Sequence, residues 1–421
     1  MAVWCYENDL FNPKLHYQIQ KRHHYQLTLS SKQLHVTTAK AFNTYFSSVA
    51  RKLIQKLPEN NHLAQKDPLI NLNSNSKTPI SSLRFKYTTT HEVNSVIQSL
   101  KIKDSYGYDE ISSRILKISA PYILSPLTYI INKILSTGIF PERLKFSEIR
   151  PVHKKGLTTE FSNYRPISLL ITFSKIIEKI IYKRLYNYLL KHDILVKEQF
   201  GFREGLSTDM DNYALLNSVL TSLDKKYLIG GIFCDLQKAF DCVNHNIILA
   251  KLEFYGITGT ANQLMRSYLE NRFQRVVIKD DMHPLTASRW EKVEHGVPQG
   301  SVLGPLLFLI YINDLAQIIR NIARPISFAD DTSIIISNGG TQEFKNTIKT
   351  VMDIIIKWFQ NNLLYMNYEK THFIQFLTKQ RNRLNVQIIA LDSIIPNVNS
   401  TKFLGLTVDS TLSWKGQTRE L

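Results

Sequence analysis

The sequence predicts an α+β protein with a large buried core divided among two or three lobes. Its 421 residues are 43% hydrophobic, which suffices for a core of that size. Several segments carry apolar residues at helical spacing, whereas others are short apolar runs rich in β-branched residues, as is typical of strands. Two such runs flank the acidic pair Asp330–Asp331, so we expect a β-hairpin with both acids at its tip.

A third acid, Asp235, ends the apolar run at residues 227–234. If this strand lies beside the hairpin, three carboxylates converge. Hard divalent cations prefer such oxygen ligands, and two cations about 3.5–4 Å apart stabilise both the attacking and the leaving oxygen of an in-line phosphoryl displacement. The pattern therefore indicates a polymerase centre, although an Asp-Asp pair between apolar runs is most often an ordinary solvated turn.

The formal net charge of +17, from 52 Lys+Arg against 35 Asp+Glu, favours a polyanionic partner such as nucleic acid. A membrane surface attracts the same charge, but the longest apolar stretch, residues 302–312, is far shorter than the roughly 20 residues that a spanning helix requires. The first residues do not resemble a signal peptide, so we expect no membrane partner and an intracellular location, in the nucleus or cytoplasm. The three cysteines show neither metal-ligand spacing nor a disulfide framework.

Residues 1–82 are expected to form an N-terminal extension. Apolar residues between positions 38 and 57 fall on one face at helical spacing, with Lys40 and Asn43 among the residues opposite. This pattern predicts one docked amphipathic helix. Residues 71–82 are rich in Asn and Ser, which indicates a linker to the body of the protein.

The next helices are expected at residues 89–100, 111–136 and 172–192. Thr89 and Glu92 can form a capping box at the start of the first helix. The third helix should expose a basic stripe, which a solvated face explains more readily than a nucleic-acid contact does. This stripe consists of Lys175, Lys179, Lys183 and Arg184.

Two short strands with a mobile connection are expected at residues 148–156 and 163–166. They would bring Lys154 and Arg165 towards a common point. There, a planar guanidinium and a compact ammonium could clamp the negative oxygens of a triphosphate.

The second half of the chain supplies the elements around the hairpin. Residues 296–308 form a glycine-punctuated turn that opens an apolar helix, a pattern that an ordinary loop into a core helix explains about equally well. Residues 341–361 should form a helix beneath the sheet, and residues 372–377 a further strand. Lys370 lies in the turn between these two elements.

Six short motifs follow one another along the chain. They are Asn163–Leu169, Gln199–Arg203, Asp235–His245, Gly296–Ser301, Phe328–Asp331 and Lys402–Val408. In this order they resemble the motif series of reverse transcriptases from non-LTR (LINE-type) retrotransposons. The resemblance covers about residues 39–414, and its specificity comes from the ordered series, since Phe-Ala-Asp-Asp alone would be a weak signal.

The resemblance implies a right-hand polymerase, with residues 83–226 mainly fingers and residues 227–421 mainly palm, the two interleaved along the chain. The palm is then a ferredoxin-like antiparallel sheet with helices on one face. Proteins of such elements usually add an endonuclease ahead of the polymerase and a thumb behind it. Because residues 1–82 are too few for that nuclease and the last palm motif lies close to Leu421, we expect both the endonuclease and the thumb to be missing.

The implied activity is that of an RNA-directed DNA polymerase. A primer 3′-hydroxyl attacks the α-phosphate of a deoxynucleoside triphosphate, with two Mg²⁺ ions, or Mn²⁺ in their place, bound at the acids. The partners would be an RNA template, a DNA primer and deoxynucleoside triphosphates. The implied metal ligands are Asp235, the carbonyl oxygen of Leu236, Asp330 and Asp331.

The resemblance also implies roles around the nucleotide. Lys154 and Arg165 would bind the triphosphate together with main-chain N–H groups of the turn that begins at Leu236, and Lys370 would protonate the leaving pyrophosphate as a general acid. Phe240 would exclude a 2′-hydroxyl by a steric clash, although without the resemblance a core Phe is the better explanation. The remaining pocket residues would be Gln299, Gly300 and Ala329.

Two alternatives stay open. The chain could be a truncated, catalytically inactive nucleic-acid-binding remnant, or a reverse transcriptase of the group II intron or retron type, which shares the acid motifs. The intact acids argue against long decay, whereas the truncated C-terminal end argues for it. The run Lys238–His245 favours the LINE type.

Overall fold

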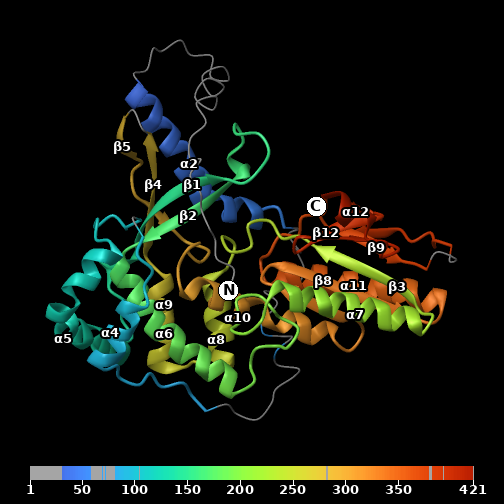
Figure 1. Ribbon diagram of the computed structural model, residues 1–421, viewed down its shortest axis with the longest axis horizontal. Coiled ribbons are helices and arrows are strands. Elements are labelled where there is room, and N and C mark those ends of the chain that lie inside the picture. Colours follow the sequence, from blue (N-terminus) through green and yellow to red (C-terminus); the bar gives the residue numbers. More distant parts are fainter. Residues whose placement is uncertain are drawn as a thin grey trace.

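The computed structural model describes residues 31–57, 69, 72, 81–103, 105–280, 283–378, 382–391 and 393–420. A five-stranded sheet and a four-stranded sheet form the centres of two lobes, with helices packed around them (Figure 1). Segments that are distant in sequence contribute to each sheet, so the two lobes are interleaved along the chain. Residues 1–30 and most of the linker expected at 71–82 lie outside the described residues.

The larger sheet has the strand order β2-β1-β4-β5, with β6 paired to β4. Its strands are β1 (Phe146–His153), β2 (Tyr164–Leu170), β4 (Arg272–Asp280), β5 (His283–Ala287) and β6 (Glu291–Val293). The antiparallel β1–β2 pair confirms the two short strands expected from the sequence. Strand β4 runs parallel to β1 and comes from a much later segment, for which the sequence analysis made no prediction.

Three helices pack against one another in the largest core. They are α4 (Thr90–Gln98), α5 (Ser113–Thr137) and α6 (Thr172–Lys191). All three confirm expected helical segments, and α5 continues through Pro121 and Pro126. The Thr89 hydroxyl accepts a hydrogen bond from the Glu92 N–H at 3.2 Å and caps α4, while the Glu92 carboxylate accepts from the Thr88 hydroxyl and Arg184, so only the Thr89 half of the expected capping box forms.

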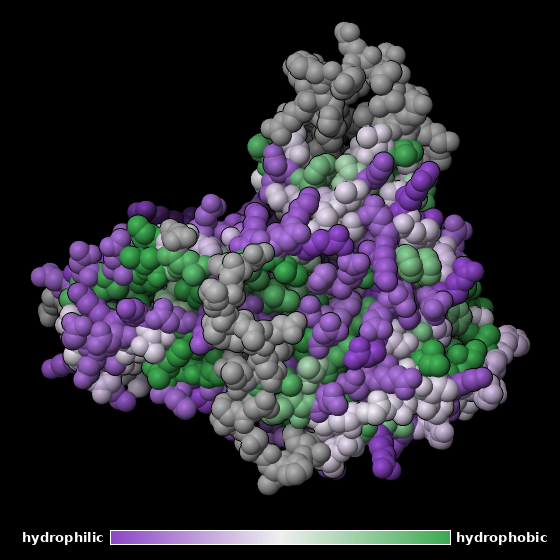
Figure 2. Space-filling view, turned by 180° about the vertical axis from the view of Figure 1, so that it is seen from behind, coloured by the Kyte–Doolittle hydropathy of each residue, from purple (hydrophilic) through white to green (hydrophobic). Residues whose placement is uncertain are grey.

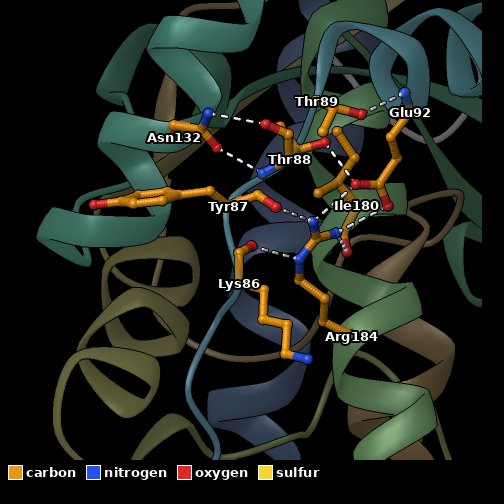
Figure 3. Close-up of polar contacts among 8 residues, drawn as sticks. All are labelled: Lys86, Tyr87, Thr88, Thr89, Glu92, Asn132, Ile180 and Arg184. Carbon is orange, nitrogen blue, oxygen red and sulfur yellow. Dashed lines mark hydrogen bonds and ion pairs between the residues drawn. The ribbon is translucent and has the colours of Figure 1, made fainter.

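The basic stripe expected on α6 is not a continuous solvated face. The Arg184 side chain is only 14% exposed and pairs with Glu92 at 2.9 Å, while donating to the carbonyl oxygens of Lys86 and Tyr87 (Figure 3). Burial also lowers the pKa of Lys175. The expectation was wrong for Arg184, because the segment that precedes α4 crosses α6 and takes up the arginine.

Helix α2 (Ser31–Ile54) packs against β4 and β5 and confirms the docked amphipathic helix. Phe42 is buried in this contact. Asn43, which helical spacing assigned to the polar face, is buried as well. It donates to the carbonyl oxygen of Arg289 at 2.9 Å and accepts from Gln274 at 3.1 Å, so two hydrogen bonds satisfy its amide inside the interface.

The smaller sheet is antiparallel throughout, with the order β7-β8-β3-β9. Its strands are β3 (Leu228–Cys234), β7 (Arg324–Phe328), β8 (Asp331–Asn338) and β9 (His372–Phe376). Strand β3 is buried along its whole length, and its residues alternate between two cores. Leu228 and Ile232 join the core that contains α10 (Leu303–Ile319) and α11 (Thr341–Asn361).

The opposite face of this sheet is also covered. Ile229 and Phe233 pack in a second core with Leu215 and Val219 of α7 (Thr208–Asp224). The expectation of helices on one face only was therefore wrong. Because the β3 segment carries no polar residue on either side, it requires a core on both faces.

The remaining elements complete the two lobes. They are α8 (His245–Phe254), α9 (Gly259–Leu269), β10 (Ile388–Ala390), β11 (Ser393–Ile395), β12 (Ser400–Phe403), β13 (Leu406–Asp409) and α12 (Lys415–Glu420). Helix α9 contacts both α5 and α8. Helix α8 in turn contacts α10. The β12–β13 hairpin contributes Phe403 and Val408 to the second core.

Polar residues dominate the exterior. Seen from behind, hydrophilic residues (purple) cover much of the described surface, with hydrophobic ones (green) in patches between them (Figure 2). Buried basic residues include Lys145, Lys251 and Arg272. None of the helices in the described ranges combines the length and the apolar character that crossing a membrane requires.

Candidate active site

The four-stranded sheet brings three acids together. Strand β3 pairs with β8 in a register that sets Cys234 opposite Thr332, so Asp235 follows at the end where β8 begins with Asp331. Strands β7 and β8 form the expected hairpin, in which Phe328 pairs with Asp331 across a two-residue turn. That turn consists of Ala329 and Asp330, and Ala329 has a positive φ of 56°.

The electrostatics of these acids reflect their proximity. Desolvation, and then the charges of Asp330 and Asp235, raise the pKa of Asp331 to about 7. Desolvation is also the main cause of the raised pKa of Asp330, and Asp235 contributes to it. Lys154 acts in the opposite direction on both groups. The three carboxylates therefore repel one another, and the nearby positive charge of Lys154 offsets this repulsion only in part.

The donor set fits a hard divalent cation. All three side chains are carboxylates, and a cation between them would relieve their repulsion. Across the described ranges, no three His, Cys, Asp or Glu side chains already stand in an arrangement that could hold a metal ion. The fit therefore rests on the chemistry of the donors and their mutual repulsion, not on a preformed cage.

Asp235 is held by residues 367–371, a turn in which only Lys370 was an expected site residue. The Asn367 side-chain amide donates to the Asp235 carboxylate at 3.0 Å, and the Asn367 N–H donates to the Asp235 carbonyl oxygen at 2.8 Å. The Asp235 N–H donates to the Thr371 hydroxyl at 3.3 Å. Asn367 and Thr371 flank Lys370, so their position beside an expected site residue was the available signal.

The turn after Asp235 offers fewer main-chain N–H groups to a phosphate than expected. Leu236 bridges to Met366, and the Gln237 N–H donates to the carbonyl oxygen of Tyr365 at 2.9 Å. This N–H is therefore committed inside the protein and does not face a phosphate. Lys238 follows with a positive φ of 50°, which closes the turn.

A group of basic side chains faces the acids. Burial lowers the pKa of Lys154, and the nearby charges of Arg165 and Lys370 lower it further, while Asp235 opposes the change. Lys370 itself is exposed. Lys238, which the sequence analysis passed over, donates to the carbonyl oxygen of Tyr164 at 2.9 Å and so ties the turn after Asp235 to strand β2.

Phe240 lies half-buried between core and surface. Its ring stacks on Phe308 of α10 with centroids 4.4 Å apart and meets the edge of Phe202 at 6.0 Å. Its carbonyl oxygen accepts from the Val297 N–H at 3.0 Å. The ring is thus held against α10, and the backbone of Phe240 is held by the 296–301 loop.

That loop is fastened to strand β2 and to the turn after Asp235. The Ser168 N–H donates to the Gln299 carbonyl oxygen at 2.8 Å, and the Gln299 amide donates to Asp241 at 2.9 Å. Gly300 has a φ of +112°, and a Cβ there would lie 2.9 Å from the Ser168 carbonyl oxygen. Only glycine meets both requirements without strain.

Two buried acids near the site had no role in the sequence analysis. Glu178 of α6 accepts from the N–H groups of Val302 and Leu303 at 2.7 and 3.2 Å, so it caps α10 from another helix. Asp211 of α7 is fully buried with both carboxylate oxygens unpartnered, and burial together with Asp331 raises its pKa to about 7. Neither residue belongs to a local pattern that would have identified it.

Known proteins resemble this chain over most of the described lobes. The family model for reverse transcriptase (RNA-dependent DNA polymerase) matches residues 152–408. The probable RNA-directed DNA polymerase from transposon BS of Drosophila melanogaster is 31% identical over 352 residues, which is 80% of this chain and 38% of that protein. The RNA-directed DNA polymerase from mobile element jockey of the same species is 29% identical over 343 residues, or 79% of this chain and 36% of that protein. The chain thus spans little more than a third of the length of these relatives.

Proposed function

Because this chain belongs to the reverse transcriptase (RNA-dependent DNA polymerase) family and is related to non-LTR retrotransposon enzymes, we propose that it extends a DNA primer with deoxynucleotides on an RNA template. The observation that carries the proposal is the meeting of Asp235 with the Asp330–Asp331 turn at one end of the four-stranded sheet. The neighbouring Lys154 supports it, because a triphosphate needs cationic partners beside the acids.

In the proposed reaction, Asp235, Asp330 and the Leu236 carbonyl oxygen would hold divalent cations, with Asp331 as a less direct ligand. Two bound Mg²⁺ ions, or Mn²⁺, would supply charge stabilisation at the attacking and leaving oxygens. Asn367 would keep the Asp235 carboxylate oriented through its amide.

The chain's other residues would bind and orient the nucleotide. Lys154 and Arg165 would contact the triphosphate, and Lys370 would give a proton to the leaving pyrophosphate. Phe240 would fill the space that a 2′-hydroxyl needs, because its ring is fixed against Phe308. The pocket would be completed by Gln299, Gly300 and Ala329.

We further propose that residues 83–226 act mainly as fingers and residues 227–421 mainly as palm, with residues 1–82 as an extension that docks through α2. Strands β4 to β6 join the proposed fingers, and α7 joins the proposed palm. RNA template, DNA primer and deoxynucleoside triphosphates are the proposed partners, in the nucleus or cytoplasm.

Primer extension on an RNA template tests the proposal. The unchanged chain should incorporate deoxynucleotides, and Asp235→Asn and Asp330→Asn should each lower the rate by at least about 10²–10³-fold, since each removes charge from the reacting centre. Both variants should still bind template, measured by fluorescence anisotropy with labelled RNA. Incorporation that survives in both variants would contradict the assignment.

The net charge of +17 also favours a second function, the binding of nucleic acid without catalysis. If the unchanged chain binds RNA but yields no product on any primer–template, a nucleic-acid-binding remnant would explain the chain better. Such a result would leave the fold untouched and remove the catalytic roles.

A further inference from the structure

The turn that carries Asp330 contains a backbone conformation that needs support. Ala329 sits in the left-handed region with a φ of 56° and is buried. Residues other than glycine rarely adopt this region, and they keep it only where the surroundings fix it. What fixes Ala329 therefore also fixes the residue that follows it, Asp330.

One side chain binds both backbone groups of Ala329. Gln199 is only 4% exposed, and its side-chain carbonyl oxygen accepts from the Ala329 N–H at 2.8 Å and from the Gly201 N–H at 2.9 Å. Its amide nitrogen donates to the Ala329 carbonyl oxygen at 3.3 Å. A single glutamine thus acts as donor and acceptor toward the same residue, as a paired strand would.

The backbone around Gln199 extends this contact along β7. The Ser327 N–H donates to the Glu198 carbonyl oxygen at 2.9 Å, and the Phe200 N–H donates to the Ser327 carbonyl oxygen at 2.8 Å. A Cβ at Gly201 would lie 2.3 Å from the Ala329 nitrogen, so no larger residue fits there. The backbone of residues 198–201 therefore packs directly against strand β7 and the turn, with no room for a side chain at Gly201.

We propose that Gln199 is a positioning residue that holds Ala329 in its left-handed conformation and so sets the place of Asp330 relative to Asp235. This inference rests on the proposed polymerase function. It gives a task to the motif Gln199–Arg203, for which the sequence suggested none. An amide is required because glutamate would leave the Ala329 carbonyl oxygen without a donor, and alanine would leave both backbone groups unpaired.

The test compares Gln199→Ala and Gln199→Glu with a matched control. Gln375→Ala removes another buried glutamine, which lies in strand β9 at the edge of the four-stranded sheet opposite β7. Its side-chain carbonyl oxygen accepts from the Leu384 N–H at 3.0 Å. Single-nucleotide incorporation gives kcat and KM, and Mn²⁺ titration followed by electron paramagnetic resonance gives the ion affinity. Thermal unfolding reports the stability of each variant.

We expect Gln199→Ala to lower kcat about 10–100-fold with little change in the KM for the nucleotide, because a displaced ligand costs rate more than substrate binding. Mn²⁺ affinity should fall as well, and Gln199→Glu should lie between the alanine variant and the unchanged protein. Gln375→Ala should lower the unfolding temperature but leave kcat and Mn²⁺ affinity unchanged.

A compensating change separates positioning from general destabilisation. Glycine adopts the left-handed region freely, so Ala329→Gly should recover part of the kcat lost in Gln199→Ala, and the two changes should not be additive. Additive effects, or a Gln199→Ala variant with the kcat and Mn²⁺ affinity of the Gln375→Ala control, would overturn the inference.

The two proposals fail in different ways. If the unchanged protein incorporates no nucleotide, the proposed function fails, and the ratio of Mn²⁺ affinities between Gln199→Ala and the unchanged protein still decides the role of Gln199. If the unchanged protein is active and Gln199→Ala keeps its kcat and ion affinity, only the inference on Gln199 is contradicted.

Discussion

Phe240 is the residue whose replacement bears most directly on substrate choice. Its ring is fixed by Phe308 at 4.4 Å, so it cannot turn away from an added hydroxyl at low cost. We expect Phe240→Ala to lower the preference for deoxynucleotides over ribonucleotides about 10–100-fold, because specificity set by a clash disappears with the clashing group. The ratio of kcat/KM for the two triphosphates measures this.

Phe202→Ala is the matched control, since the Phe202 ring meets Phe240 only in a T-shaped contact with centroids 6.0 Å apart and Phe202 is 41% exposed. It should leave the ratio close to that of the unchanged protein. An unaltered ratio in Phe240→Ala would instead mean that this ring serves the core alone.

Asp331 makes the affinity for cations depend on pH. Its pKa is raised from 3.8 to about 7, so between these values the folded, metal-free protein holds a proton that the unfolded chain has released. The stability of the metal-free protein therefore falls as pH rises through this window, and a cation must expel the proton to bind. We expect Mn²⁺ binding to release protons near pH 6 and far fewer above pH 8, measured by titration calorimetry in buffers of different ionisation enthalpy.

The pKa of Asp211 is also raised to about 7. Two variants therefore show which of the two carboxyl groups releases the protons when Mn²⁺ binds. Asp331→Asn should abolish most of the release, whereas Asp211→Asn should retain it. Equal proton release at both pH values in the unchanged protein would rule out this linkage.

Local patterns predicted that each acid lies at the end of an apolar strand, whereas the convergence of Asp235 with Asp330 and Asp331 depended on the pairing of β3 with β8, which the structure supplies. Of the residues that orient them, only Asn367 carried a local signal, its place near Lys370. Gln199 and Asn367 act through hydrogen bonds to segments far away in the chain, and no spacing within one sequence reveals such a bond.

Helices α8, α10 and α11 are joined by a buried ion pair, and this contact makes a prediction about stability. The Lys251 ammonium lies 2.6 Å from Asp314, both side chains are fully buried, and the Trp358 indole N–H donates to the same carboxylate at 2.8 Å. Asp314→Asn leaves a buried ammonium without its counter-charge. We expect a loss of about 3–5 kcal/mol in the free energy of unfolding, measured by urea denaturation.

The exposed pair of Arg266 and Glu270 on α9 provides the comparison, with side chains about half exposed. Glu270→Gln should cost less than about 1 kcal/mol, because solvent screens such pairs. A cost for Asp314→Asn as small as that of Glu270→Gln would show that the buried pair does not stabilise the junction of the three helices.

Helices were easier to predict than the five-stranded sheet. The segments of α5, α6 and α11 carry their own apolar periodicity, so their bounds agree closely with expectation. Strand β4 depends on a parallel partner, β1, from a distant part of the chain, and such pairing leaves no local trace. The second covered face of the smaller sheet could have been inferred from the uniformly apolar β3 segment.

The whole molecule combines a basic exterior with a site whose main charges are acidic. The charge of +17 suits a long polyanion, while the carboxylates at the end of β3 and β8 create the need for cations. The ordered motifs predict a division into fingers and palm, which stays a prediction. The two sheets are interleaved along the chain, since residues 272–293 join the sheet of β1 and β2.

The proposed function depends on Asp235 and Asp330 holding two divalent cations together. Anomalous diffraction tests this most directly, with crystals that contain the protein, a primer–template, Mn²⁺ and a non-hydrolysable deoxynucleoside triphosphate analogue. We expect two anomalous peaks about 3.5–4 Å apart, both within coordination distance of Asp235. A bound triphosphate with no anomalous peak at Asp235 would contradict the proposed function.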